Sequence, residues 1–195
     1  MKILLTAFGP FHNYVENPSQ MVLNEIIDQN KFKNILEFET IDVSYSAVNN
    51  FVESINNNFD LIIHMGVASD NDLIRFETLA QNLSTGKDIR NIELNSQIIN
   101  SNVSQLETNF PLSLLKNVIE KFPSDICFSK DAGTYLCNYV YFKSLFNFQH
   151  KTNVLFVHIA DFIKNESALN LNQQVEILNE LISSYILDNK ENKND

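Results

Sequence analysis

The sequence predicts a single α/β domain, built as a three-layer α/β/α sandwich around a mainly parallel twisted sheet. Short apolar runs alternate with segments of helical periodicity along the chain, and this alternation is typical of a parallel sheet covered on both faces. The 195 residues fit one domain. Hydrophobic residues make up 44% of the chain and charged residues 19%, which favours a globular core over disorder.

Five segments have the composition of strands. Leu61–Gly66 is the clearest, because it is a continuous apolar run that ends at a glycine, as in a strand buried on both faces. The N-terminal apolar run stops at Gly9 without a small-residue cleavage site, so we interpret it as a buried first strand and not as a signal peptide. The predicted strands are Lys2–Phe8, Ile35–Val43, Leu61–Gly66, Asp125–Ser129 and Val154–His158.

Five helices are expected beside these strands. Asn17-Pro18-Ser19 has the residues of a helix start and opens the first. Three more are predicted over Tyr45–Asn56, Pro111–Phe122 and Tyr135–Asn147. The apolar face of the last is marked at a 3.6-residue period by Leu171, Val175, Leu178, Ile182 and Tyr185.

Two segments have no clear periodicity. Leu83–Asn109 is one of them, and a loop of this length in a small domain is more often a functional excursion than an idle connection. Residues 188–195 form the other, a polar C-terminal tail that we expect to be frayed. The domain is therefore predicted to span residues 1–187.

The charge and cysteine content restrict the partners and the compartment. The chain has 14 Lys and Arg against 24 Asp and Glu, a net charge of −10 that argues against nucleic acid or an anionic membrane surface as partner. No apolar run approaches the ~20 residues that span a bilayer. The two cysteines are too few for a disulfide scaffold and are typical of a reducing compartment. We therefore expect a cytoplasmic protein.

Motifs for phosphate or metal binding are missing from the sequence. Its four glycines form no glycine-rich phosphate loop, and no spacing of histidines and cysteines matches a metal site. We therefore expect no metal and no organic cofactor.

Cys137 is the candidate nucleophile. It follows the turn at 131–134 and begins a predicted helix, where free backbone N–H groups and the positive end of the helix dipole stabilise a thiolate. The alternative is an inert buried thiol, since free cysteine is among the most buried residue types. Cys127 lies within a short strand among apolar neighbours and is expected to be inert.

A cysteine nucleophile needs a base, and the base needs an orienting group. His158 ends a predicted strand, at the sheet edge where the sites of parallel α/β proteins assemble, although a capped or solvent-facing histidine is equally compatible. Glu77 lies in an apolar segment and needs a partner there. That partner is either a site residue or, in a structural salt bridge, Arg75 or a lysine.

Four blocks of residues, which follow one another between Met1 and about Tyr185, resemble the motifs of a known family. They are Leu4-Leu5-Thr6-Ala7-Phe8-Gly9-Pro10-Phe11 with Asn17-Pro18-Ser19, Glu77-x-x-Ala80-x-Asn82, Asp131-Ala132-Gly133-Thr134-Tyr135-Leu136-Cys137-Asn138-Tyr139, and Phe156-Val157-His158-Ile159. Together they resemble the pyroglutamyl peptidase I (pyrrolidone-carboxylate peptidase) family of cysteine peptidases. The third block is the most specific of the four.

The resemblance implies a catalytic triad of Cys137, His158 and Glu77. Cys137 would attack an amide carbonyl and form a thioester acyl-enzyme, His158 would transfer the protons, and Glu77 would orient the imidazole. The implied substrate is a peptide with an N-terminal pyroglutamate, and the implied assembly is a homo-oligomer, a dimer or tetramer. The apolar character of the helix at Tyr135–Phe146 on almost all sides is compatible with such an interface or with burial.

The resemblance also implies a pocket for the pyroglutamyl ring. Phe8 and Phe11 would pack on the ring, with Asn17 as a polar partner; ordinary core packing is the alternative for the two phenylalanines. The loop at 83–95 departs from the family, because Lys87 stands where an arginine is usual and the Pro-Asp-Asn-Glu-Gly stretch is missing. Two other functions therefore stay open: a related cysteine amidohydrolase acting on another small acyl group, and a non-catalytic binding protein that retains the fold.

Overall fold

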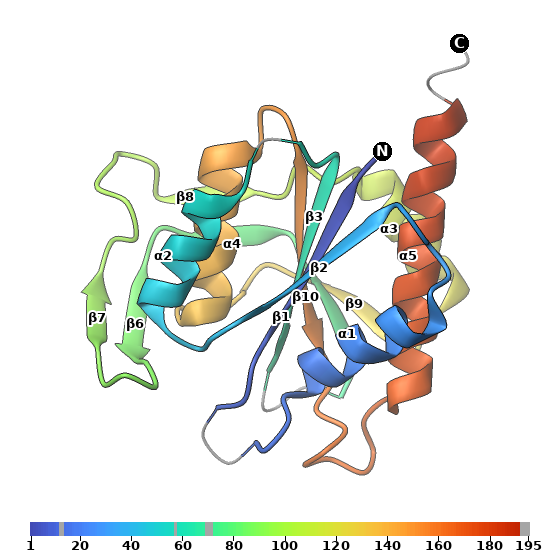
Figure 1. The fold of residues 1–195 in the computed structure, drawn as a ribbon, viewed down its shortest axis with the longest axis horizontal. Coiled ribbons are helices and arrows are strands. Elements are labelled where there is room, and N and C mark those ends of the chain that lie inside the picture. Colours follow the sequence, from blue (N-terminus) through green and yellow to red (C-terminus); the bar gives the residue numbers. More distant parts are fainter. Residues whose placement is uncertain (12–13, 57, 69–71, 192–195) are drawn as a thin grey trace.

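Six strands form a central sheet. The computed structural model, which describes residues 1–11, 14–56, 58–68 and 72–191, arranges them in the order β2 (Leu36–Ile41), β1 (Ile3–Phe8), β3 (Leu61–Val67), β10 (Asn153–Ile159), β4 (Ile74–Glu77) and β9 (Ile126–Ser129). The first four strands in this order are parallel, whereas β4 is antiparallel to β10 and parallel to β9 (Figure 1). The predicted mainly parallel sheet is confirmed.

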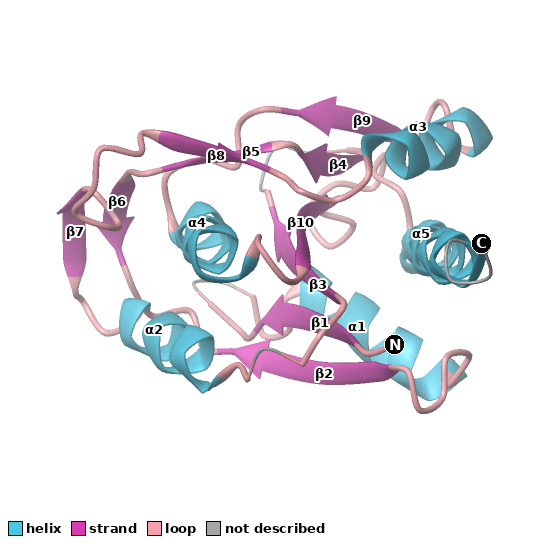
Figure 2. Ribbon diagram, turned by 90° about the horizontal axis from the view of Figure 1, so that it is seen from above, coloured by secondary structure: helices cyan, strands magenta, loops and turns pink. Residues whose placement is uncertain are grey.

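Two layers of helices cover the sheet (Figure 2). One face carries α1 (Pro18–Gln29), α3 (Leu112–Lys121) and α5 (Leu171–Glu191), and the other carries α2 (Tyr45–Ser54) and α4 (Leu136–Phe148). The structure therefore confirms the three-layer α/β/α sandwich. No helix in the described part of the chain combines the length and apolarity needed to cross a membrane.

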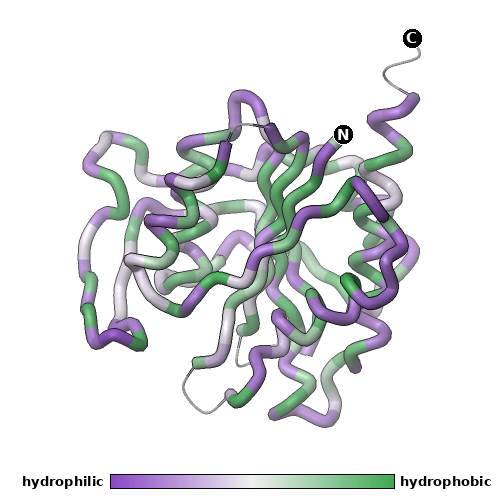
Figure 3. The backbone as a smooth tube through the Cα atoms, in the orientation of Figure 1, coloured by the Kyte–Doolittle hydropathy of each residue, from purple (hydrophilic) through white to green (hydrophobic). Residues whose placement is uncertain are grey.

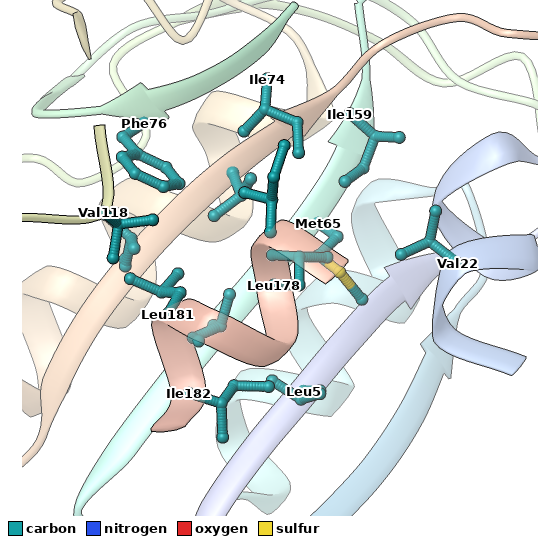
Figure 4. Packing of buried hydrophobic residues seen from close by; sticks show 14 of the residues in the cluster. Leu5, Val22, Met65, Ile74, Phe76, Val118, Ile159, Leu178, Leu181 and Ile182 are labelled. Carbon is teal, nitrogen blue, oxygen red and sulfur yellow. The ribbon is translucent and has the colours of Figure 1, made fainter. Parts of the chain in front are cut away.

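Alternation along the strands divides the hydrophobic core in two. The odd-numbered residues of β1, β3 and β10 pack on α1 and α5, where Leu5 and Met65 lie close to Leu178 and Ile182 (Figure 4). The even-numbered residues of the same strands pack towards α2 and α4. Because both faces are covered, the central strands are continuous hydrophobic stretches, while the polar stretches lie in the outer segments (Figure 3).

The helix α4 is buried on nearly all sides within one chain. Tyr141, Phe142 and Val140 are fully buried, and so is Ser144 on the same helix. Its apolar character is thus explained without a second subunit, so it no longer supports the predicted homo-oligomer.

The segment without clear periodicity forms two short antiparallel pairs. β5 (Leu79–Gln81) pairs with β8 (Gln105–Glu107), and β6 (Ser84–Lys87) pairs with β7 (Glu93–Ser96). The side chain of Asn138 anchors them to α4, since its Nδ2 donates to the carbonyls of Gln81 and Leu83 and its Oδ1 accepts from the N–H of Gln81. This segment is therefore folded against the helix that carries Cys137.

The predicted boundary of the tail does not coincide with the end of a helix. α5 continues to Glu191, and Nδ2 of Asn189 donates to the carbonyl of Tyr185. The apolar face ends at Ile186, so the periodicity stops there although polar residues continue the helix for another turn. Residues 192–195 of the predicted tail lie outside the described residues.

Candidate active site

A row of four residues runs across four adjacent strands, from β3 in the middle of the sheet to β9 at its edge. Gly66 in β3, His158 in β10, Arg75 in β4 and Cys127 in β9 are successive register partners. Residues that face each other across strands point to the same side of the sheet, so these side chains share the face that α4 covers. The row contains the predicted base and the glycine beside it.

The helix α4 brings Cys137 onto this row. The helix begins at Leu136, so Cys137 lies in its first turn, where backbone N–H groups have no intrahelical acceptor. The half-buried thiol is hydrogen-bonded to His158. A Cβ placed on Gly66 would lie 2.7 Å from Sγ of Cys137, so the sulfur occupies the space that this glycine leaves open.

Glu77 completes the series. Its Oε1 accepts a hydrogen bond from Nδ1 of His158 at 2.7 Å, and the carboxylate is fully buried. Among the described residues, Oε2 has no hydrogen-bond partner. The alternative salt bridge from Arg75 to Glu77 is not formed, and the partner of Glu77 is His158.

The surroundings of His158 favour its charged form. Burial by itself would lower the pKa of the imidazole. The hydrogen bonds and charges of Cys137 and Glu77 outweigh burial and raise the pKa of His158 to about 9 from its ordinary 6.5. The ring is therefore an imidazolium at neutral pH, held between a sulfur and a carboxylate.

Two cavities meet at Cys137. The smaller one, of about 60 Å³, is lined by Phe8, Phe11, Asn17, Val43, Val67, Tyr135, Leu136 and Cys137. The larger one, of about 550 Å³, includes Arg75, Asp131, Tyr135, Cys137, His158 and Lys164 in its lining. A nucleophile between a small apolar pocket and a wide groove can act on a substrate that reaches into both.

The comparison with known proteins identifies the family. A model of the pyroglutamyl peptidase family matches residues 1–176 of the chain. The chain belongs to this family. It is therefore a hydrolase of the cysteine-peptidase type.

Curated relatives and solved structures agree with this membership. Pyrrolidone-carboxylate peptidase 2 of Caldanaerobacter subterraneus subsp. tengcongensis is 29% identical over 167 residues, which cover 82% of this chain and 81% of that protein. The pyrrolidone-carboxylate peptidase of Lactobacillus helveticus is 25% identical and covers 82% of this chain and 83% of its own. The crystal structure of the pyrrolidone carboxyl peptidase from Thermus thermophilus has a TM-score of 0.83 at 24% identity, over 92% of this chain and 98% of that one. This last likeness shows the shared fold.

Phe8, Phe11 and Asn17, the predicted ring-binding residues of this peptidase, line the smaller cavity. Phe8 is 5% exposed and belongs to the core, whereas Phe11 is half-buried and stacks on Tyr14 with 5.0 Å between ring centroids. Asn17 caps α1, because its Oδ1 accepts from the N–H and the hydroxyl of Ser19. Its Nδ2 donates to the carbonyl of Gly9. These contacts give Asn17 a structural role and leave one N–H of its amide for the predicted role of polar partner.

Thr78, which follows Glu77, and Lys87, which stands where the family usually has an arginine, both lie outside the lining of the two cavities. Thr78 donates from its hydroxyl to the carbonyl of Ser129, so it joins β4 to β9. Lys87 has an exposed side chain and lines neither cavity, and its carbonyl accepts a hydrogen bond from the hydroxyl of Tyr135. Tyr135, which sequence reasoning did not single out, lines both cavities. Its position two residues before Cys137 was the only signal for it.

Cys127, the second cysteine, lies at the edge of the sheet. The thiol is half-buried and not fully buried, because β9 is the edge strand of the sheet. Burial nevertheless raises the pKa of the Cys127 thiol, against an opposing effect of Arg75 beside it. In the described ranges, no group of three or more His, Cys, Asp or Glu side chains is placed to hold a metal ion.

Proposed function

We propose that this peptidase removes pyroglutamate from the N-terminus of peptides through a thioester on Cys137. The observation that carries the proposal is the hydrogen-bonded series of Cys137, His158 and Glu77 at the meeting point of the two cavities. This series supplies a nucleophile, a base and an orienting carboxylate, which are the parts that covalent acyl transfer requires.

The first half-reaction transfers the acyl group to sulfur. The proton of the thiol resides on His158, and Sγ of Cys137 forms a bond to the carbonyl carbon of the substrate. Backbone N–H groups in the first turn of α4 can stabilise the oxyanion that forms. When the C–N bond breaks, His158 gives its proton to the leaving amine, and the thioester remains.

The second half-reaction releases the acid. Water attacks the thioester carbonyl while His158 accepts its proton, and the C–S bond then breaks to return the thiol and free pyroglutamate. Glu77 keeps Nδ1 protonated throughout, so Nε2 is the atom that exchanges protons.

The two cavities assign the two parts of the substrate. His158 lines the larger cavity and is not among the residues that line the smaller one. Because the general acid must reach the leaving nitrogen, the leaving group belongs in the larger cavity and the acyl group in the smaller. A cavity of about 60 Å³ holds roughly four to six waters, comparable with the six heavy atoms of a lactam ring and its oxygen.

The lining of the smaller cavity favours a neutral acyl ring over an amino acid with a free amine. Apart from Cys137 itself, it consists of uncharged residues, with Phe8, Phe11 and Tyr135 as its aromatic walls. An ammonium group there would lack an anionic partner, at a cost of several kcal/mol. The cytoplasmic location and the homo-oligomer stay predictions from the sequence and from the resemblance.

The proposal is tested with aminomethylcoumarin reporters. The pyroglutamyl reporter should be cleaved, while the prolyl reporter should not, since its ring has the same size but carries an ammonium in place of the lactam. Cys137→Ala is the control for activity from contaminants. Equal cleavage of both reporters would contradict the assigned pocket, and cleavage of neither by folded protein would favour a binding protein.

A further inference from the structure

We propose that the peptidase selects leaving groups that carry a carboxylate, which Arg75 and Lys164 bind in the larger cavity. This inference rests on the proposed function, because it concerns the part of the substrate that departs as the amine. It adds a substrate class, namely pyroglutamyl compounds with an anionic group one residue beyond the scissile bond.

Arg75 lies directly beside the proposed general acid. It is the register partner of His158 in the antiparallel pair of β10 and β4, so the two Cβ atoms are about 4.5–5.5 Å apart on the same face. Both residues line the larger cavity. Since His158 protonates the leaving amine, the half-buried guanidinium of Arg75 lies within reach of the first residue of the leaving group.

The charge of Arg75 has no carboxylate partner within the described part of the chain. The chain contains only two arginines, and the other, Arg90, pairs with Asp42 at 3.8 Å. Glu77 lies two residues along the same strand face, but its contact is with His158. A half-buried guanidinium offers a planar fork of donors that matches a carboxylate in two parallel hydrogen bonds.

Lys164, in the loop that follows β10, supplies a second cation to the larger cavity. Its Nζ lies 3.6 Å from the centroid of the Tyr14 ring, which positions the ammonium while leaving its N–H donors available. The hydroxyl of Tyr14 donates to the buried carboxylate of Asp161, so the loop after β10 is tied to the segment that carries Phe11. Lys164 and Tyr14 both line the larger cavity.

The net charge of the cavity lining favours an anion. Asp131 is its one carboxylate among the described residues, and one of its oxygens accepts a hydrogen bond from the N–H of Gly133. Arg75 and Lys164 outnumber it, while the charge of the His158 imidazolium is balanced by the carboxylate of Glu77. The lining of this cavity is thus locally positive, although the chain as a whole carries a net charge of −10.

A carboxylate could come from two sources, and paired substrates distinguish them. Pyroglutamyl-alanine and its amide test a C-terminal carboxylate, whereas pyroglutamyl-glutamic acid amide and pyroglutamyl-glutamine amide test an acidic side chain. We expect kcat/KM to be about tenfold higher for the charged member of at least one pair. Arg75→Gln should reduce that ratio about tenfold and Arg75→Lys should reduce it less, because the positive charge is retained. Arg90→Gln removes the same charge on the surface and should leave the ratio unchanged.

Each outcome decides between the two proposals. A ratio near one in both pairs, with the pyroglutamyl reporter still cleaved, would overturn the carboxylate site and leave the proposed function intact. A ratio that survives Arg75→Gln would also overturn it. If no pyroglutamyl compound is cleaved, both proposals fail. If Arg75→Gln does not fold, Arg75→Lys and a salt titration of the parental protein replace it as tests. The parental ratio should fall with added salt, since salt screens an electrostatic preference at a half-exposed site. A parental ratio that salt does not change would overturn the carboxylate site.

Discussion

The sulfur of Cys137 lies in the space that a side chain at Gly66 would occupy. A Cβ at this glycine would be 2.7 Å from Sγ and 2.9 Å from Cζ of Phe156, closer than real Cβ atoms approach other heavy atoms. Phe156 is fully buried and has little room to move. Gly66 is thus required because it has no side chain, which leaves room for α4 to bring the thiol beside His158.

Gly66→Ala should therefore displace the thiol. We expect kcat/KM on the pyroglutamyl reporter to fall by about 100-fold or more, since misplacing a reacting group by about 1 Å costs that much. Gly9→Ala is the matched control, because its Cβ would meet Cγ2 of Thr40 at an ordinary 3.7 Å. Unchanged activity in Gly66→Ala would show that the sulfur does not react from this position.

Glu77→Gln should change the pH profile as well as the rate. The parental kcat/KM should decline above pH 9, as the His158 imidazolium, with its pKa raised to about 9, loses its proton. Glutamine removes the negative charge that helps to raise this pKa, so the alkaline limb should move towards 6.5 and kcat should fall by about 10²–10⁴-fold. The contribution of this pair to stability is complete below pH 6.5 and is lost as the pH rises through 9. An alkaline limb that does not move would contradict the assigned role of Glu77.

The main architecture could be predicted because the hydrophobic patterns that indicate it extend over many residues. Leu61–Val67 is an uninterrupted apolar strand, and α5 repeats its apolar face over many turns. The triad was less accessible from the residues alone. Periodicity could not decide whether Glu77 pairs with Arg75 or with His158, since strand pairing of β10 and β4 brings both within reach. The family resemblance supplied that choice, and the hydrogen bond to His158 agrees with it.

The remaining features depend on contacts that a sequence does not display. Strands β4 to β8 have only three or four residues each, too few to establish a period of two. The sequence indicates Arg75 only as an alternative salt-bridge partner of Glu77, because its place in the row beside His158 follows from the tertiary pairing. The half-exposure of Cys127 likewise depends on β9 being an edge strand.

His64 should make the fold sensitive to acid. Its Nδ1 lies 2.8 Å from Oγ1 of Thr6 and its Nε2 lies 2.9 Å from Oγ of Ser144, so it joins β1, β3 and α4. Burial lowers the pKa of His64 to about 3. Between pH 6.5 and 3 the unfolded chain binds a proton that the folded protein does not. The contribution of neutral His64 to stability is therefore complete above pH 6.5 and falls as the pH decreases towards 3.

Urea unfolding at several pH values tests this dependence. His64→Gln should lower the free energy of unfolding at pH 7 by about 1–3 kcal/mol and should flatten its dependence on pH between 6 and 4. His150 is exposed, so His150→Gln should keep the parental slope. If His64→Gln retains the full slope, other groups cause the loss of stability in acid.

The two cysteines should differ in reactivity and in function. Cys137 lies in the first turn of α4 and is hydrogen-bonded to His158, whereas the Cys127 thiol has a pKa raised by burial. Limited iodoacetamide at neutral pH should modify Cys137 first, with loss of activity in proportion to one label per chain. Cys127 should react mainly at higher pH, because it is half-exposed but protonated at neutral pH.

Substitution separates the reactive thiol from the inert one. Cys137→Ala should be folded and inactive, because the nucleophile is lost while the apolar surroundings of the side chain tolerate a methyl group. Cys127→Ala should keep parental kcat/KM and lose about 1 kcal/mol of stability, as is typical when a partly buried side chain is shortened. Peptide mapping that finds Cys127 labelled first, together with loss of activity, would move the nucleophile to β9. Turnover in Cys137→Ala would be incompatible with a thioester on Cys137, and hence with the proposed mechanism as a whole.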